Sequence, residues 1–279
     1  MLLNGEYASA VSLHDRGLAY GDGLFETVLI ANGQPVLLEW HLARLQRGCE
    51  RLGLEPELDS LRRELCMLLA APPEPFDPLP ERCVVKLLLT RRAGGRGYRP
   101  GSRAAERLLL LYPAPEDAAR HAQTGIEVFL CRQSLARQPS LAGLKHLNRL
   151  EQVLASQEWP DEGVQEGLMA DTEGLLIEGT RSNVFLRRQG CLLTPDLGRC
   201  GIDGVLRQYL LSRWPEPVAV VDVPLAWLED AEEVFVCNSV VGVWPVTGLR
   251  LPRGLRRLPI GTAARCASHL FQQVCQHAS

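Results

Sequence analysis

Short apolar runs separated by turn residues dominate the first part of the chain. Two of these runs, at residues 26–30 and 35–38, flank Asn32 and Gly33. An Asn-Gly pair between apolar runs is the strongest short-range signal for a β-hairpin. Leucines then recur at roughly helical spacing over residues 39–52, until a glycine stops the run. The pattern therefore predicts an antiparallel hairpin followed by a helix.

The following residues complete what reads as one apolar unit. A second helix is predicted over residues 58–70, and the proline-rich stretch 72–80 ends it. The runs CVVKLLLT and RLLLLY read as buried strands on either side of the glycine-rich sequence RRAGGRGYRPGS. Residues 113–123 are polar and contain proline, as expected at a domain boundary. We predict a small N-terminal domain over 1–112, a linker over 113–123 and a larger domain over 124–279.

The predicted larger domain is rich in strands. Helices are expected around residues 148–158, after Asp203 and over 262–276. Strands are expected at IEVFLC, EGLMAD, GLLIEG, NVFLRR, CLLTP, VAVVDV and EEVFVCN. Strands that follow strands, with helices interspersed unevenly, predict an α+β fold and not a doubly wound parallel sheet.

Composition narrows the classes of partner. Hydrophobic residues make up 46% of the 279 residues and charged residues 23%, which is enough apolar material for a folded core. The net charge of −3 gives no electrostatic reason to expect nucleic acid or an anionic membrane as a partner, so small molecules are expected. No apolar stretch reaches the roughly 20 residues of a membrane span.

The start of the chain has no secretory signal, and the nine cysteines contain no C-x-x-C pair. We read them as reduced thiols of the core, which indicates the cytoplasm. The six histidines form no pair at metal-ligand spacing, and no metal is expected.

The chain contains only two lysines, Lys86 and Lys145. A lysine that forms a Schiff base needs an amine that can lose its proton near neutral pH, beside polar groups that hold a cofactor. Lys145 lies between a small-residue turn and an amphipathic helix in SLAGLKHLNRLEQVLA. Lys86 lies within VVKLLLT, where a partly solvated structural lysine is the simpler interpretation.

Four segments, in this order along the chain, resemble the class IV aminotransferase family. They are DRGLAYGDGLFET at 15–27, SLAGLKHLNRLEQV at 140–153, LIEGTRSNVF at 176–185 and CGIDGVLR at 200–207. The lysine segment is most similar to that of aminodeoxychorismate lyases. The resemblance implies a pyridoxal-phosphate enzyme with a two-domain fold of type IV. In that fold the small domain is α/β and the larger domain has a barrel-like sheet. Members of the family are homodimers.

By this resemblance, Lys145 is the Schiff-base lysine. Glu178 pairs with the pyridine nitrogen of the cofactor, and such a carboxylate favours the protonated ring that acts as an electron sink. Asn183 belongs to the same cofactor segment. Thr27 or protonated Lys145 is the implied proton donor to the departing group.

The cofactor phosphate requires backbone N–H groups at a helix start and a cation. The turn at residues 204–206 could supply those amides, although Asp203 could instead be an ordinary N-cap that competes for them. The resemblance assigns the phosphate to the amides of Val205 and Leu206 and to Arg44, Asn238 and Ser239. For the carboxylates of the substrate, the candidates are Arg96 and Tyr98, and the resemblance allows these contacts to cross a subunit boundary.

The implied reaction is elimination of pyruvate from 4-amino-4-deoxychorismate to give 4-aminobenzoate, a step of folate biosynthesis. Two alternatives remain open. A D-amino-acid or branched-chain transaminase shares the first proton abstraction, whereas a silent protein of the same fold would bind the cofactor without turnover.

Overall fold

The computed structural model describes residues 1–94 and 97–277. The chain divides into two compact units. The first comprises Met1–Ala114, Leu144–Asn148 and the last residues from Cys275, and the second comprises Pro115–Gly143 and Arg149–Val274. The domain boundaries predicted from the sequence stay a prediction, because the units are sets of residues in mutual contact and not continuous stretches of chain.

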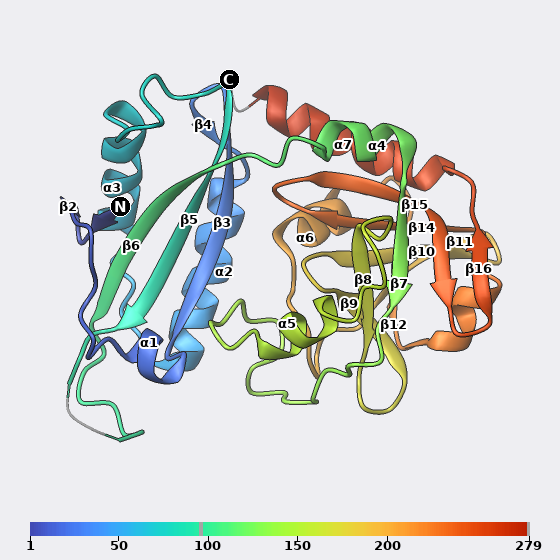
Figure 1. Ribbon diagram of the computed structural model, residues 1–279, viewed down its shortest axis with the longest axis horizontal. Helices are drawn as coiled ribbons and strands as arrows, with labels where there is room; N and C mark the ends of the chain where they lie inside the picture. The colour runs from blue at the N-terminus through green and yellow to red at the C-terminus, as the bar shows by residue number, and fades with distance from the viewer. Residues whose placement is uncertain (95–96, 278–279) are drawn as a thin grey trace. The chain divides into compact units, whose positions relative to one another are not determined.

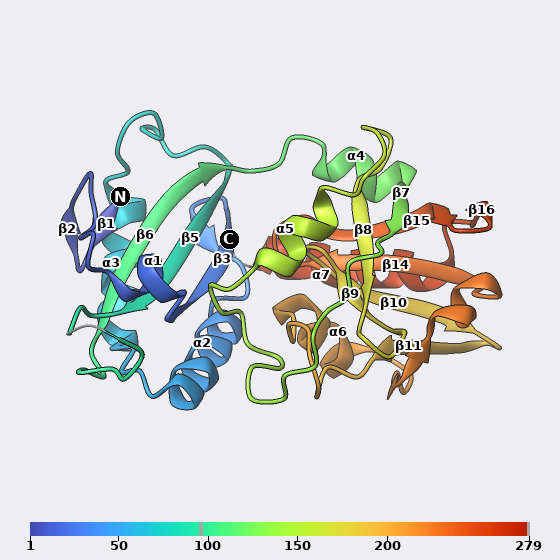
Figure 2. The same cartoon turned by 60° about the horizontal axis from the view of Figure 1, so that its bottom comes forward.

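The first unit contains an antiparallel sheet in the order β2-β1-β6-β5-β3-β4 (Figure 1). Its strands are β1 (Leu2–Leu3), β2 (Glu6–Tyr7), β3 (Gly23–Ala31), β4 (Gln34–Pro35), β5 (Arg82–Arg91) and β6 (Ala105–Pro113). Its helices are α1 (Arg16–Tyr20), α2 (Leu38–Leu52) and α3 (Leu58–Ala70). Helix α2 packs against β3, α3 packs against β6, and α1 contacts β5, as the turned view in Figure 2 also shows.

The predicted hairpin is present, and its turn explains the Asn-Gly pair. Asn32 and Gly33 both adopt positive φ, 50° and 74°, as a tight turn between β3 and β4 requires. The predicted second strand, however, is wrong beyond Pro35. Leu37 adopts a φ of 56°, which ends the extended backbone, and α2 begins at Leu38.

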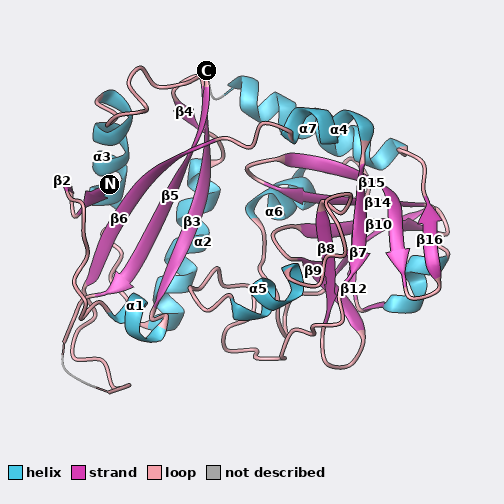
Figure 3. Ribbon diagram, viewed as in Figure 1, coloured by secondary structure: helices cyan, strands magenta, loops and turns pink. Residues whose placement is uncertain are grey.

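The second unit contains a ten-stranded mixed sheet, and strands make up much of it (Figure 3). Its path runs β12-β11-β10-β14-β15-β7-β8-β9-β13, and β16 pairs with β15. The strands are β7 (Ile126–Leu130), β8 (Glu166–Ala170), β9 (Leu175–Gly179), β10 (Asn183–Arg188), β11 (Cys191–Pro195), β12 (Ala219–Val221), β13 (Val223–Pro224), β14 (Glu233–Asn238), β15 (Gly242–Leu251) and β16 (Gly254–Arg257). Within the described residues the end strands β12 and β13 do not pair with each other, so the predicted barrel-like sheet is not confirmed.

Helices α4 (Ala118–Thr124), α5 (Leu150–Ser156), α6 (Val205–Arg213) and α7 (Thr262–His277), with a 3₁₀ turn at Leu225–Glu229, complete the elements. Helix α4 packs on β15, α5 on β8 and α6 on β14. Residues 118–124, which the sequence placed largely in a linker, therefore form a helix of the second unit.

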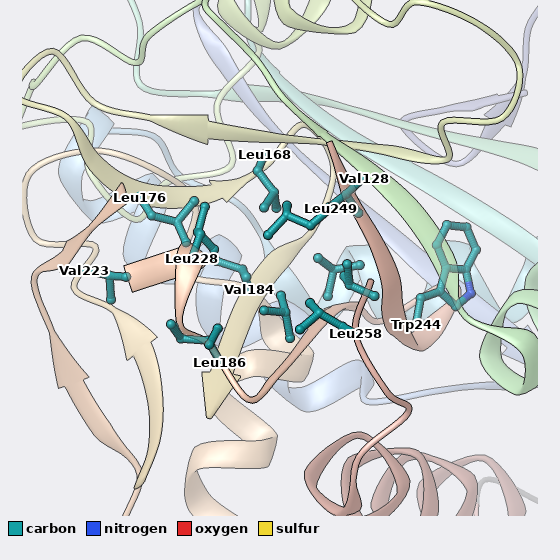
Figure 4. Packing of buried hydrophobic residues seen from close by; sticks show 14 of the residues in the cluster. Val128, Leu168, Leu176, Val184, Leu186, Val223, Leu228, Trp244, Leu249 and Leu258 are labelled. Carbon is teal, nitrogen blue, oxygen red and sulfur yellow. The ribbon is translucent and has the colours of Figure 1, made fainter. Parts of the chain in front are cut away.

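The core of the second unit is made by inward-facing apolar residues of these strands. Val128, Leu168, Leu176, Val184 and Leu249 are almost completely buried in one cluster (Figure 4). Such a core holds the strand ends in fixed positions, and several candidate site residues lie at those ends.

All nine cysteines are free, and five of them are buried. Cys66 and Cys191 are exposed, so the thiols are not uniformly core residues. Among the described residues, no helix combines the length and the apolar character that crossing a membrane requires.

Candidate functional site

The Lys145 segment extends the sheet of the first unit. The amide of Phe25 donates to the carbonyl of Lys145 at 2.9 Å, and the amide of Leu147 donates to the carbonyl of Gly23 at 3.1 Å. His146 forms a bridge with Leu24 in the same antiparallel pairing. This backbone pairing fixes the register of the segment against the start of β3. The Nζ of Lys145 lies 4.3 Å from the ring centre of Phe25, within the range of a cation–π contact.

The exposed fractions along β3 alternate as expected for a strand. Glu26 is buried, whereas Phe25 and Thr27 on the opposite face are half-buried. Thr27 pairs directly with Lys86 of β5. The Nζ of Lys86 lies 5.4 Å from the same Phe25 ring. Both lysines of the chain therefore approach one aromatic side chain, which composition alone did not indicate.

Arg44 belongs to a buried charged group on the other face of β3. Its Nε donates to Glu26 at 2.8 Å, a terminal nitrogen donates to the same carboxylate, and His41 Nδ1 contacts Glu26 at 2.6 Å. All three side chains are at most 6% exposed. Burial alone would raise the pKa of Glu26, but the charges and hydrogen bonds of Arg44 and His41 outweigh it and lower that pKa to about 2. Glu26 therefore fixes the guanidinium that the sequence assigned to a phosphate.

Glu178 is the last residue but one of β9 in the second unit and is 2% exposed. Its carboxylate accepts from the amide of Ile202 at 2.7 Å and from Gln152 Nε2 at 3.4 Å. The carboxylate also interacts electrostatically with Arg149 and favours the charged form of that guanidinium. A buried carboxylate favours a positively charged partner. The pairing of Glu178 with the ring nitrogen of the cofactor stays a prediction.

The start of α6 fits a phosphate. Its N-cap is Gly204, which has extended backbone and no side-chain cap. Asp203, the possible competitor, accepts from Arg207 at 2.9 Å. The first amides of a helix have no acceptor within the helix, so those of Val205 and Leu206 can receive an anion at the positive end of the dipole.

Asn183 braces this turn. Its Nδ2 donates to the carbonyl of Ile202 at 2.8 Å. A Cβ placed on Gly204 would lie 1.8 Å from Asn183 Oδ1, so only glycine fits beside it. In this structure Asn183 supports the turn that presents the amides, and direct contact with the cofactor stays a prediction.

Asn238 also organises backbone. Its Oδ1 accepts from the amides of Val240 and Val241, both at 2.9 Å, and its Nδ2 donates to the carbonyl of Arg181 at 3.2 Å. Ser239, the next residue, is 8% exposed. The roles of both as phosphate donors stay predictions, and the observed contacts of Asn238 shape the turn that carries Ser239.

The two substrate candidates belong to the loop between β5 and β6. Arg96 lies outside the described residues. The Tyr98 side chain is 87% exposed, and its ring meets Tyr20 edge-on at 5.6 Å between centres. Its backbone carbonyl accepts from Arg16 at 3.0 Å.

The sequence interpretation missed a buried carboxylate beside the predicted cofactor segment. Glu166 of β8 is 1% exposed and accepts from Thr180 Oγ1, Ser182 Oγ and the amides of Gly167 and Thr180, at 2.5 to 3.0 Å. It thereby holds the turn that joins β9 to β10. A charged residue at the start of the otherwise apolar strand EGLMA was the available signal. Glu26 and His41 were missed in the same way. In the described residues, no three His, Cys, Asp or Glu side chains gather as metal ligands would.

Comparison with known families gives a clear result. Residues 23–249 match the model of the amino-transferase class IV family. The chain belongs to this family. Both the predicted family and the predicted α+β fold are confirmed.

Individual relatives and solved structures are similar to the chain over nearly its whole length. A solved structure of 4-amino-4-deoxychorismate lyase from Pseudomonas aeruginosa is 45% identical, with a TM-score of 0.89, over 98% of each chain. An aminodeoxychorismate lyase of Vibrio harveyi is 32% identical over 94% of this chain and 96% of its own. The pyridoxal-phosphate-bound form of a hypothetical aminotransferase from Mycobacterium tuberculosis has a TM-score of 0.78 over 98% of this chain and 95% of its own. At 22% identity, it shows the shared fold alone.

Proposed function

We propose that this class IV family member is a pyridoxal-phosphate-dependent aminodeoxychorismate lyase. It converts 4-amino-4-deoxychorismate to 4-aminobenzoate and pyruvate. The observation that carries the proposal is the 45% identity to the Pseudomonas aeruginosa lyase over 98% of both chains, against 22% for the Mycobacterium tuberculosis aminotransferase.

The cofactor is held by groups with separate tasks. The amine of Lys145 would attach it covalently, Glu178 would pair with its ring nitrogen, and the amides of Val205 and Leu206 would bind its phosphate. Arg44, Asn183, Asn238 and Ser239 complete this set. Bound pyridoxal phosphate supplies an electron sink for the reaction. The glycine N-cap of α6 and the buried Glu178 carboxylate support this assignment.

Lys145 is the base of the reaction. With pyridoxal phosphate bound, the amine of Lys145 would remove the proton from the amine-bearing ring carbon of the substrate. Its Nζ lies against the ring of Phe25, and its backbone is hydrogen-bonded to β3. This arrangement limits the positions of the amine and reduces the entropy lost in reaching the substrate.

Loss of this proton and of the enolpyruvyl group would leave an aromatic ring. Thr27 or protonated Lys145 gives a proton to the departing enolpyruvyl carbon, so that pyruvate is released. Atoms and electrons balance without an oxidant, because the gain of aromaticity and the loss of pyruvate occur within one molecule. Arg96 and Tyr98 bind substrate carboxylates. The enzyme is a cytoplasmic homodimer.

The decisive experiment combines the purified protein, pyridoxal phosphate and enzymatically generated aminodeoxychorismate. Release of 4-aminobenzoate and pyruvate in equal amounts, above a control without enzyme, is the expected outcome. Keto acids formed from D- or branched-chain amino acids, with neither lyase product, would instead make the chain a transaminase. Cofactor absorbance without any turnover would make it a binding protein.

A further inference from the structure

Asp22 connects two segments that are distant in the sequence. Its Oδ2 accepts from Arg16 Nε and from Arg91 Nε, both at 2.9 Å. The two arginines are at most 4% exposed. Asp22 belongs to the family segment at 15–27, whereas Arg91 ends β5, where the loop to β6 begins. The carboxylate therefore ties the N-terminal segment to the base of this loop.

Arg91 fixes the two ends of the loop. Its terminal nitrogens donate to the carbonyls of Ser102 at 3.0 Å, Gly53 at 3.0 Å and Leu52 at 2.7 Å. Its backbone amide also donates to the carbonyl of Asp22 at 3.0 Å. The backbone on both sides of the loop is thus held by one guanidinium.

Arg16 holds the segment nearer to the loop tip. One terminal nitrogen donates to the carbonyl of Gly97 at 2.9 Å, and the other donates to the carbonyl of Tyr98 at 3.0 Å. The planar guanidinium suits this task, because its donors have a fixed geometry that can bind two successive carbonyls. A lysine has a single ammonium and cannot reproduce it.

Tyr20 also contacts this segment, and we call Arg16 and Tyr20 together the clamp. Its ring lies 4.8 Å from Arg16 Cζ and meets the Tyr98 ring edge-on, and its hydroxyl accepts from the amide of Gly97 at 3.3 Å. Gly97 has a φ of 87°, which other residues rarely adopt, so the turn is specified locally as well.

We infer that Arg16, with Tyr20, is a positioning residue for substrate binding, because it fixes the Gly97–Tyr98 segment. This inference rests on the proposed function in one respect, namely that Tyr98 contacts the substrate. The clamp then acts on the affinity for a carboxylate-bearing substrate and not on the proton transfers, which other residues perform.

The test compares Arg16→Met, Arg16→Lys and Tyr20→Phe with Arg92→Ala. Arg92 is a matched control, because its Nε pairs with Glu106 at 2.9 Å near the same loop but with half of its side chain exposed. Hydrogen–deuterium exchange of the peptide that contains Gly97 and Tyr98 is measured first, on protein without cofactor or substrate. KM and kcat follow on the holoenzyme, with aminodeoxychorismate as substrate.

Arg16→Met removes the two hydrogen bonds that Arg16 donates to the carbonyls of Gly97 and Tyr98. We therefore expect about tenfold faster exchange of this peptide and an about tenfold higher KM, with kcat little changed. Arg16→Lys retains a cation for Asp22 and falls between Arg16→Met and the wild type, and Tyr20→Phe gives a smaller change in the same direction. Arg92→Ala matches the wild type. Should Arg16→Met not fold, Arg16→Lys and Tyr20→Phe test the proposal in its place.

Unchanged exchange in the Arg16 and Tyr20 variants would overturn the clamp itself. Faster exchange with an unchanged KM would overturn its role in substrate binding. A wild-type protein without lyase activity would refute the proposed function, but the exchange measurement would still show whether the clamp exists.

Discussion

Substitution of Glu26 by glutamine tests whether the buried charged group beneath β3 stabilises the protein. The carboxylate is 1% exposed, and Arg44 and His41 lower its pKa from the ordinary value of 4.5 to about 2. A shift of this size corresponds to about 3 kcal/mol of stability at pH 7. Removal of the negative charge also leaves the guanidinium of Arg44 buried without this partner, a change that typically costs about 3–5 kcal/mol.

The dependence on pH has a definite sign. Because the folded pKa lies below the unfolded value, the ionised carboxylate stabilises the fold above about pH 4.5, and the stabilisation disappears as the pH falls toward 2. At pH 3 most of the unfolded carboxylates are protonated while folded Glu26 is still largely ionised. The contribution should therefore fall by about 2 kcal/mol between pH 7 and pH 3.

Urea unfolding of the wild type and of Glu26→Gln at both pH values measures this difference. Glu39→Gln, in the helix α2 that carries His41 and Arg44, is the control. Its carboxylate is 71% exposed and pairs with Arg62, and such a surface pair contributes less than about 1 kcal/mol. Equal losses from the two substitutions, or a gap for Glu26→Gln that does not shrink in acid, would refute the reasoning.

Three further predictions concern the cofactor. Lys145→Ala should lose both the visible absorbance of the attached cofactor and the lyase activity, whereas Lys86→Ala should keep the absorbance. Equal loss of absorbance in the two variants would remove Lys145 from its role. Glu178→Gln should retain cofactor but lower kcat by about a hundredfold, since its charge stabilises what forms after proton abstraction; undiminished turnover in a steady-state assay would exclude it. Gly204→Ala places a Cβ 1.8 Å from Asn183 Oδ1, so fluorescence titration should show at least about tenfold weaker cofactor binding, and wild-type affinity would contradict the phosphate assignment.

Elements with strong local signals could be predicted from the sequence. Helix α3 occupies residues 58–70 as predicted, and β5 and β6 coincide with continuous apolar runs. Strand β15 gave no such signal, because its sequence GVWPVTGLRL contains two glycines and a proline, which are unfavourable in strand interiors. Helix α1 has five residues, too few for a periodic pattern. Only its caps could have indicated it, since Asp15 accepts from the amide of Leu18 and Gly21 is left-handed.

The residues of the candidate site likewise divide into those with a local sequence signal and those without one. Lys145 and Glu178 lie in segments whose residue order alone suggested their chemistry. The partners that hold such groups are chosen by the fold, as when Glu26 meets a guanidinium 18 residues away or Asp22 meets Arg91. No local pattern encodes these pairings, because each depends on a strand and a helix or loop that come together only in the folded unit.

The backbone pairing of Lys145 with Phe25 places a constraint on length. In an extended segment, neighbouring side chains point to opposite sides, so a single inserted or deleted residue before Lys145 would exchange the sides of the whole segment. Leu144 or His146 would then occupy the place of the amine beside Phe25. Substitutions between Ser140 and Leu144 alter packing and can be compensated by neighbours. A change in the number of residues there cannot be compensated, because only one register presents an amine to the ring.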